Sequence, residues 1–244
     1  MTTRIDVEDV RARLAAAGTP ERAVGAKAYL KSDLEFLGAR VPDIRRIAKS
    51  WLRAHPDLSR TDLIRAVRAT WRPRVHELRN LAGVLLELRS DLLAPADLAL
   101  LERMIREAGT WAYVDLIAIR AVGSIAERFD VGTELDRWSV DEDFWVRRSA
   151  MLALLLPLRR GEGDWDRFVR YADSMIEEKE FFIRKAIGWV LRDVSKVDPD
   201  RVIRFLEPRV DRASGLTLRE GLKYVDEADR ERLLTRSRAR ARRR

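Results

Sequence analysis

The feature that most constrains the fold is a short pattern that recurs five times along the chain. Each copy begins with an aliphatic residue, continues in most copies with a polar or charged pair, and ends with small or apolar residues. Successive copies begin 34, 36, 32 and 37 residues apart, at Ile44–Ala48, Leu78–Ala82, Val114–Ala118, Val146–Ala150 and Ile183–Ile187. Periods of this length are typical of helix pairs that stack side by side. The irregular spacing favours a HEAT-like array over a strict repeat.

The stretches between these copies predict the partner helices of the pairs. Apolar residues recur there at helical spacing, and we expect helices over 61–71, from Ala94 onward, over 164–176 and 199–205, with short closing helices over 216–224 and 229–234. No segment alternates apolar and polar residues with turn signals at its ends, so we expect no sheet. The sequence therefore predicts an all-α fold, a curved HEAT-like helical-repeat solenoid with a concave face.

Composition excludes several classes of site. The chain of 244 residues contains no cysteine, which excludes disulfides, zinc fingers, iron–sulfur clusters and a thiol nucleophile. The two histidines, His55 and His76, lie far apart in the sequence, and we expect both to be solvated surface residues rather than metal ligands. We expect no metal and no organic cofactor.

No apolar run is long enough to cross a membrane, and the first residues lack the apolar core of a signal peptide. We therefore expect a cytoplasmic protein, associated with the nucleoid when it is bound to DNA, with no membrane partner.

The positive charge of the chain is concentrated at its carboxyl end. The formal net charge of +8 falls to +2 when the six arginines of residues 236–244 are left out. We expect one repeat domain over residues 1–235 and a disordered basic tail over residues 236–244. The tail is either a nonspecific attractor of polyanions or a mobile terminus without a role.

Three segments that open predicted helices combine aromatic rings with charged groups. In the first, Trp111 and Asp115 lie four residues apart and share a face, directly beside an apolar stripe. A carboxylate buried there without a partner would cost several kcal/mol, roughly, so Asp115 either pairs with a neighbouring helix or serves a site.

The second and third segments carry cations. Arg148 follows Trp145 by three residues and lies one repeat beyond Asp115, so it could pair with Asp115 or bind a phosphate as a planar fork. In the third segment, Phe182, Lys185 and Trp189 share a face outside the core stripe. Alone, such a patch indicates packing between repeats. Together, the three segments favour a site on the concave face.

These motifs resemble the AlkD-type DNA alkylation repair family. The similarity rests on Trp-x-x-x-Asp at 111–115, on Trp-x-Arg-Arg at 145–148 and on the block 181–189, and the segment 28–31 resembles the amino-terminal signature of the family. It covers residues 27–222, and one departure is Ala112, where family members often carry Asp.

The resemblance implies a HEAT-like DNA glycosylase of base excision repair that removes cationic N3- and N7-alkylated purines, such as 3-methyladenine and 7-methylguanine, without deep base flipping. It implies catalytic-site roles for Trp111, Asp115, Arg148 and Trp189. The chemistry suits these residues, because an anionic Asp115 would stabilise an oxocarbenium-like sugar.

We expect the partner to be double-stranded DNA that carries alkylated purines and the protein to be a monomer. The residues expected to contact DNA on the concave face are Arg148, Arg147, Arg184, Lys185, Phe182 and Tyr29. The main alternative is a non-catalytic HEAT-like scaffold for nucleic acid or protein, in which Asp115 and Arg148 form a structural pair. An RNA-binding repeat protein fits less well, because base-reading residues would then recur in every repeat.

Overall fold

The computed structural model describes residues 4–241 of the chain. The chain divides into two compact units, residues 1–125 and 126–244. Each unit is a separate array of helices, and each is described by itself below. Within the described residues the only pairing of the β type is one isolated parallel bridge between Glu35 and Val75, so the all-α expectation is confirmed.

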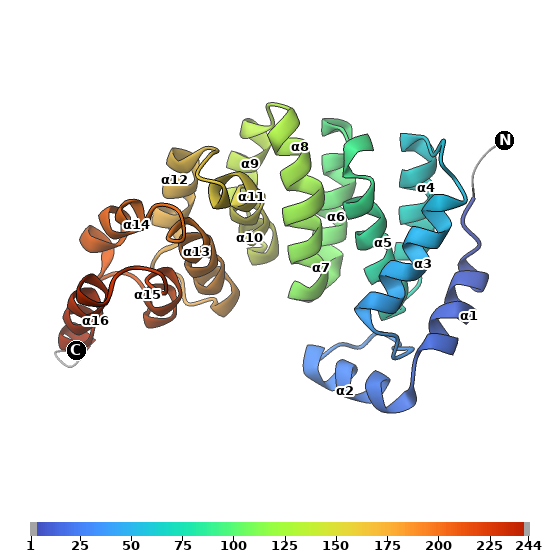
Figure 1. The fold of residues 1–244 in the computed structure, drawn as a ribbon, viewed down its shortest axis with the longest axis horizontal. Coiled ribbons are helices and arrows are strands. Elements are labelled where there is room, and N and C mark those ends of the chain that lie inside the picture. Colours follow the sequence, from blue (N-terminus) through green and yellow to red (C-terminus); the bar gives the residue numbers. More distant parts are fainter. Residues whose placement is uncertain (1–3, 242–244) are drawn as a thin grey trace. The chain divides into compact units, whose positions relative to one another are not determined.

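The first unit consists of helices in an antiparallel succession (Figure 1). Its α-helices are α1 (Val7–Ala17), α2 (Pro20–Leu30), α3 (Val41–Arg53), α4 (Arg60–Trp71), α5 (His76–Leu88), α6 (Leu98–Ala108), α7 (Trp111–Leu116) and α8 (Gly123–Arg128), the last of which crosses the boundary between the units. Short 3₁₀ turns, η1 (Ser90–Leu92) and η2 (Pro95–Asp97), precede α6, and a π-helical segment, η3 (Ile117–Val122), joins α7 to α8.

Two rows of helices build this unit. Helix α3 packs on α5 and α5 packs on α7, while α4 packs against α5 and α6 against α7 (Figure 1). Helix α5 is buried from His76 to Leu86 because it has neighbours on several sides. Gly83 allows the closest approach, since a Cβ there would lie 2.7 Å from Cδ2 of Leu116 on α7.

Local signals in the sequence explain where these helices begin. Thr19 and Ser59 accept hydrogen bonds from backbone N–H groups in the first turns of α2 and α4. Pro20 and Pro42 stand in the first turns of α2 and α3, where a missing N–H costs nothing. The expected helix over 61–71 is confirmed as α4, which begins one residue earlier.

The second unit contains α9 (Gly132–Ser139), α10 (Phe144–Leu152), α11 (Leu155–Arg159), α12 (Trp165–Met175), α13 (Phe181–Val194), α14 (Pro199–Leu206), the 3₁₀ turn η4 (Glu207–Arg209), α15 (Gly215–Gly221) and α16 (Glu227–Ala241). Helix α13 is central, because it packs against α10, α11, α12, α14 and α15. Gly188 on α13 lets α15 approach, since a Cβ there would lie 2.7 Å from Cβ of Glu220 and 3.3 Å from the backbone of Thr217.

Side-chain bonds between successive repeats link positions about one period apart. Arg60 binds Asp97 and the Trp71 indole binds Glu107 in the first unit, and Arg159 binds Asp193 and Arg209 binds Asp173 in the second. These partners are 37, 36, 34 and 36 residues apart in the chain. Each repeat therefore contacts the next at equivalent positions, which confirms the helical-repeat organisation within each unit.

The carboxyl-terminal segment differs from the sequence prediction. Helix α16 continues to Ala241, so residues 236–241, expected in a disordered tail, are helical; residues 242–244 lie outside the described residues. Arginine and alanine are strong helix formers, and Arg236 forms an ion pair with Asp211 at 3.0 Å that fastens this helix to the preceding segment.

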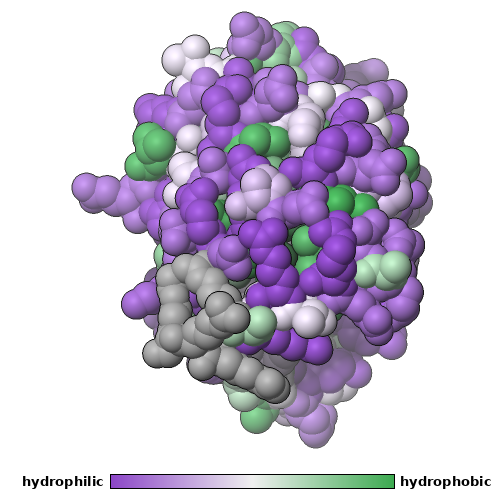
Figure 2. Space-filling model, turned by 90° about the vertical axis from the view of Figure 1, so that its left-hand side faces the viewer, coloured by the Kyte–Doolittle hydropathy of each residue, from purple (hydrophilic) through white to green (hydrophobic). Residues whose placement is uncertain are grey.

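The side of the molecule on which α14, α15 and α16 lie is polar. Figure 2 shows hydrophilic residues over most of this surface and apolar residues only in small separate patches. On α16 the side chain of Leu233 is buried, while the arginines and acidic residues of positions 227–239 are exposed or half-buried. A polar outer face is typical of the helix that caps a stack of repeats.

Candidate active site

The candidate site residues of the first unit lie at the beginning of α7. Thr110 caps this helix by accepting a hydrogen bond from the N–H of Ala112. Trp111 is 38% exposed, and its ring meets the exposed ring of Tyr29 on α2 edge to face, with centroids 6.3 Å apart. Asp115, one turn after Trp111, is half-buried. The structure thus places Tyr29, Trp111 and Asp115 at one surface, which we call the α2–α7 aromatic surface.

The opposite face of α7 is anchored in the core by a buried polar contact. Tyr113 is 1% exposed, and its hydroxyl lies 2.5 Å from Nδ1 of His76 on α5. The ring of Phe36 stacks on His76 at 4.4 Å. Sequence reasoning expected His76 to be a solvated surface residue, and this expectation was wrong. The side chain packs between Phe36 and Tyr113 because α5 is enclosed by neighbouring helices.

Burial sets the protonation of this pair. It lowers the pKa of His76 to about 4, so the imidazole is neutral near neutral pH, and it raises the pKa of Tyr113. His55, also expected to be solvated, is half-buried, and its Nδ1 lies 2.8 Å from the carbonyl oxygen of Trp51. The pair His76–Tyr113 thus joins α7 to α5.

The helix changes its winding immediately after Asp115. Residues 117–122 form the π-helical segment η3 between α7 and α8. Such π-helical turns widen the helix and are frequent at functional sites. In η3 every residue except Arg120 is buried. The change of winding therefore alters core packing directly beside the candidate carboxylate.

The candidate residues of the second unit include a buried arginine. Arg148 on α10 is 1% exposed, and its guanidinium donates a hydrogen bond to the carbonyl oxygen of Phe182. Its Cζ lies 5.9 Å from the centroid of the Phe182 ring. The Phe182 ring also contacts Trp145 at 4.7 Å and stacks with Phe144 at 6.3 Å. Arg148 therefore joins α10 to the first turn of α13 within an aromatic cluster.

Two other predicted DNA-binding arginines are engaged inside the same unit. Arg147 forms an ion pair with Glu178 at 2.9 Å and donates to the carbonyl oxygens of Asp141 and Glu142. Arg184 donates to the carbonyl oxygen of Glu178 at 2.6 Å. Both side chains are half-buried. Their hydrogen bonds therefore stabilise the loop before α13.

The exposed groups of α13 are Phe181 and Lys185. Phe181 is 52% exposed, and the ammonium group of Lys185 lies 5.7 Å from its ring centroid. An exposed cation beside an exposed ring can meet a phosphate and a sugar or base at once.

Trp189 is half-buried two turns after Phe182. Its indole N–H donates to Oδ2 of Asp193 at 3.2 Å. Asp193 is 2% exposed and also accepts hydrogen bonds from Arg159 and from Lys196. Burial alone would raise the pKa of Asp193, but these two cations outweigh it and hold the pKa below its usual value. The indole of Trp189 is therefore oriented by a fixed carboxylate.

Sequence reasoning missed Asp193, His76 and Tyr113 as determinants of the candidate site. The spacing of four residues between Trp189 and Asp193 was a signal that could have shown the first. Nothing in the sequence pairs His76 with Tyr113, which lie 37 residues apart.

Over the described residues there is no group of three or more acidic or histidine side chains able to hold a metal ion. Nor does any described helix have the length and apolar character needed to cross a membrane.

Comparison with known proteins agrees with the family suggested by the motifs. Residues 10–225 match the model of a family described as DNA alkylation repair enzyme. A solved structure from Enterococcus faecalis, described as a predicted DNA alkylation repair enzyme, is similar with a TM-score of 0.75 and 26% sequence identity, over 86% of this chain and 97% of that chain. A search among curated proteins found no match. Since the family model covers most of the chain, this protein belongs to the DNA alkylation repair enzyme family.

Proposed function

We propose that the protein is a DNA glycosylase that excises cationic N3- and N7-alkylated purines, such as 3-methyladenine and 7-methylguanine, from double-stranded DNA. The observation that carries the proposal is the α2–α7 aromatic surface. There, the exposed ring of Trp111 stands one helical turn before the half-buried carboxylate of Asp115 and meets the exposed ring of Tyr29, in a chain of the alkylation repair family. A carboxylate next to aromatic rings suits a cationic sugar and base.

The chemistry of the lesion explains why so few groups suffice. Alkylation at N3 or N7 gives the purine a positive charge and makes it a good leaving group, so cleavage needs little general-acid help. The C1′–N bond breaks with its electron pair leaving on the purine, and positive charge develops on the deoxyribose. In the proposal Asp115 stabilises that charge and orients the water that attacks C1′. Trp111 and Tyr29 contact the sugar or base, each by CH–π or cation–π contacts worth about 0.5–2 kcal/mol.

The second unit contributes contacts and positioning. We assign contact with the DNA phosphates to Lys185, because its ammonium group is exposed beside Phe181. Trp189 is a candidate for contact with the sugar or base, with its indole held by Asp193. We assign Arg148, Arg147 and Arg184 to positioning of the α13 amino terminus rather than to direct phosphate contact, because their guanidinium groups are bonded within the unit.

The test is the substitution Asp115→Asn, with Asp57→Asn as the matched control. Asp57 is exposed in the loop before α4, so the control makes the same chemical change away from the candidate site. Loss of the anion at Asp115 should lower single-turnover release of 7-methylguanine from methylated DNA by at least about tenfold while DNA affinity changes little. The control should excise at the wild-type rate.

Two outcomes would count against the proposal. An unchanged excision rate in Asp115→Asn would remove Asp115 from the mechanism. A wild-type protein that binds DNA and releases no alkylated purine would favour the non-catalytic scaffold, in which Asp115 acts only in packing.

A further inference from the structure

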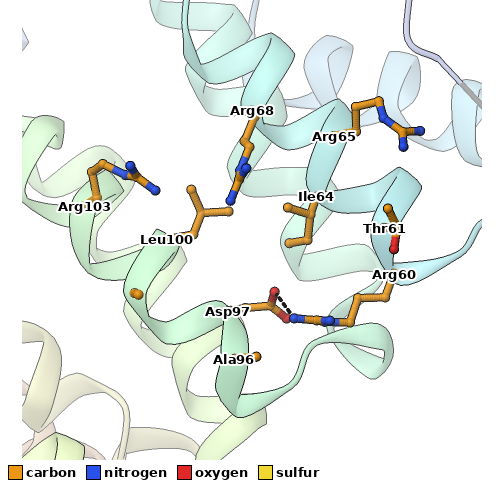
Figure 3. Close-up of a pocket in the computed structure, with 10 residues that line it drawn as sticks. Arg60, Thr61, Ile64, Arg65, Arg68, Ala96, Asp97, Leu100 and Arg103 are labelled. Atoms are coloured by element: carbon orange, nitrogen blue, oxygen red, sulfur yellow. Dashed lines mark hydrogen bonds and ion pairs between the residues drawn. The ribbon is translucent and has the colours of Figure 1, made fainter.

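A basic groove lies in the first unit, between α4 and α6. Figure 3 shows the part of it where Arg60, Arg68 and Arg103 surround the apolar side chains of Ile64 and Leu100. This cleft has a volume of about 450 Å³, and a second cleft of about 370 Å³ continues it toward the ends of both helices. The two clefts share Arg68, Leu100 and Arg103, so they form one elongated depression, which we call the α4–α6 groove.

Positive charge exceeds negative charge along the α4–α6 groove. The cationic residues that line it are Arg60, Arg65, Arg68, Arg72 and Arg103, and the acidic residues are Asp97 and Glu107. The carboxylate of Asp97 is bonded within the fold, because it accepts hydrogen bonds from Nε and Nη2 of Arg60, at 2.9 and 2.7 Å, and from the backbone N–H of Ala94. Glu107 accepts the indole N–H of Trp71 at 2.8 Å.

Arg68, Arg72 and Arg103 carry the excess charge. All three side chains are exposed, and none forms an ion pair with any carboxylate of residues 4–239. Figure 3 shows Arg68 and Arg103 extending from α4 and from α6 toward the same space above Leu100. Two cations that face one space repel each other, and an anion between them would turn this repulsion into attraction. Arg65, by contrast, pairs with Asp62 at 2.7 Å.

The length of the array indicates a chain of phosphates rather than one small anion. Arg65, Arg68 and Arg72 are spaced three and four residues apart on α4, so they share a face and extend over about 10 Å of helix. Guanidinium groups bind phosphate oxygens as planar forks. Leu100 and Ile64 give the floor an apolar surface on which a sugar can rest.

We propose that the α4–α6 groove binds the phosphodiester backbone of nucleic acid, as a contact separate from the α2–α7 aromatic surface. The two surfaces have no residue in common, and in Figure 1 α4 and α6 form the row behind α5 and α7. A backbone contact of this kind is independent of base sequence and of damage. It would hold the protein on undamaged DNA, and it requires no glycosylase activity.

The first test measures binding of an undamaged DNA duplex by fluorescence anisotropy at several salt concentrations. The test variant is Arg68→Gln/Arg103→Gln. The matched control is Arg13→Gln/Arg204→Gln, which removes the same charge from exposed positions of α1 and α14 outside the groove. Each lost phosphate contact lowers the slope of log K against log salt by about one unit, so the test variant should lose about two units and the control clearly less.

The same variants separate this proposal from the proposed function. Release of 7-methylguanine at saturating enzyme should be the same in the groove variant and the wild type, because no groove residue belongs to the α2–α7 aromatic surface. If wild-type protein excises no base, the salt-slope experiment still decides the question of the groove. Equal slopes in the groove variant and the control would overturn the proposal.

A second measurement needs no substitution. Phenylglyoxal modifies exposed arginines, and mass spectrometry identifies the sites. The duplex should protect Arg68 and Arg103 in the wild-type protein and leave Arg204 reactive. If the duplex protects neither residue, or if poly-glutamate protects both and the duplex does not, the groove binds an acidic protein or no polyanion, and the proposal fails.

Discussion

The buried pair His76–Tyr113 makes stability depend on pH in a way that one substitution should abolish. His76 packs between Phe36 and Tyr113, and burial holds its pKa at about 4 against an ordinary value of 6.5. The substitution His76→Asn keeps a polar atom near the position of Nδ1, which faces the Tyr113 hydroxyl, and removes the titrating ring. We expect the variant to lose stability at neutral pH, and to lose less than the wild type on acidification.

The sign and size of this pH dependence follow from the protons that His76 binds in the folded and unfolded states. The unfolded chain takes up a proton at His76 as pH falls through about 6.5, whereas the folded protein resists it until about pH 4. Acidification between these values therefore favours the unfolded state. Between about pH 7.5 and about pH 5, the unfolded chain takes up more protons at His76 than the folded protein does. This difference lowers the unfolding free energy of the wild type by about 2 kcal/mol, and His76→Asn does not undergo this loss.

The assay is urea unfolding followed by far-ultraviolet circular dichroism at both pH values. His55→Asn is the control, because it makes the same change at the other histidine, which is half-buried. Comparing each variant with the wild type cancels the titration of groups common to both. In addition, the proton NMR signal of the His76 ring should stay constant over this pH range.

Two results would refute this reasoning. One is a wild type and a His76→Asn variant whose stabilities fall in parallel with pH. The other is a His76 ring signal that titrates with a midpoint near the ordinary value.

Three further substitutions test the second unit. Gly188→Ala should lower the unfolding free energy by about 1–3 kcal/mol in urea unfolding, because the new Cβ would lie 2.7 Å from Cβ of Glu220 on α15; an unchanged midpoint would show that α15 can move aside. Asp193→Asn should lower the unfolding free energy by about 1–3 kcal/mol and shift the fluorescence of Trp189, since the carboxylate binds that indole and two cations. A loss of stability with unchanged Trp189 fluorescence would show that Asp193 does not orient Trp189. Arg148→Lys should lower the melting temperature and leave the salt dependence of DNA binding unchanged, because the guanidinium is bonded inside the unit. A flatter salt dependence would instead show that Arg148 contacts a phosphate.

The sequence by itself determined the helical-repeat fold and the family. A period of 32 to 37 residues was visible because each repeat places its apolar residues at helical spacing, and that spacing depends on local order along the chain. Caps and prolines likewise act within one turn, so the beginning of α4 was predicted to within one residue. Trp111 and Asp115 share a face by their spacing alone.

The tertiary structure decided which charged and polar side chains are accessible. Arg148 and Lys185 both looked like DNA contacts in the sequence, yet Arg148 is enclosed at Phe182 while Lys185 stays exposed. Residues 236–241 continue α16, and Arg236 pairs there with Asp211, which lies 25 residues earlier in the chain.

The same limit applies to the histidines and to the α4–α6 groove. Whether His76 is solvated depends on helices that arrive from other repeats, and whether Arg68 and Arg103 face one space depends on how α4 and α6 pack. Burial and charge pairing are set by neighbours distant in sequence, whereas helical periodicity and capping are set by neighbours within a turn or two. For this reason the sequence was sufficient for the fold, and only the packed structure could show which groups remain available for chemistry.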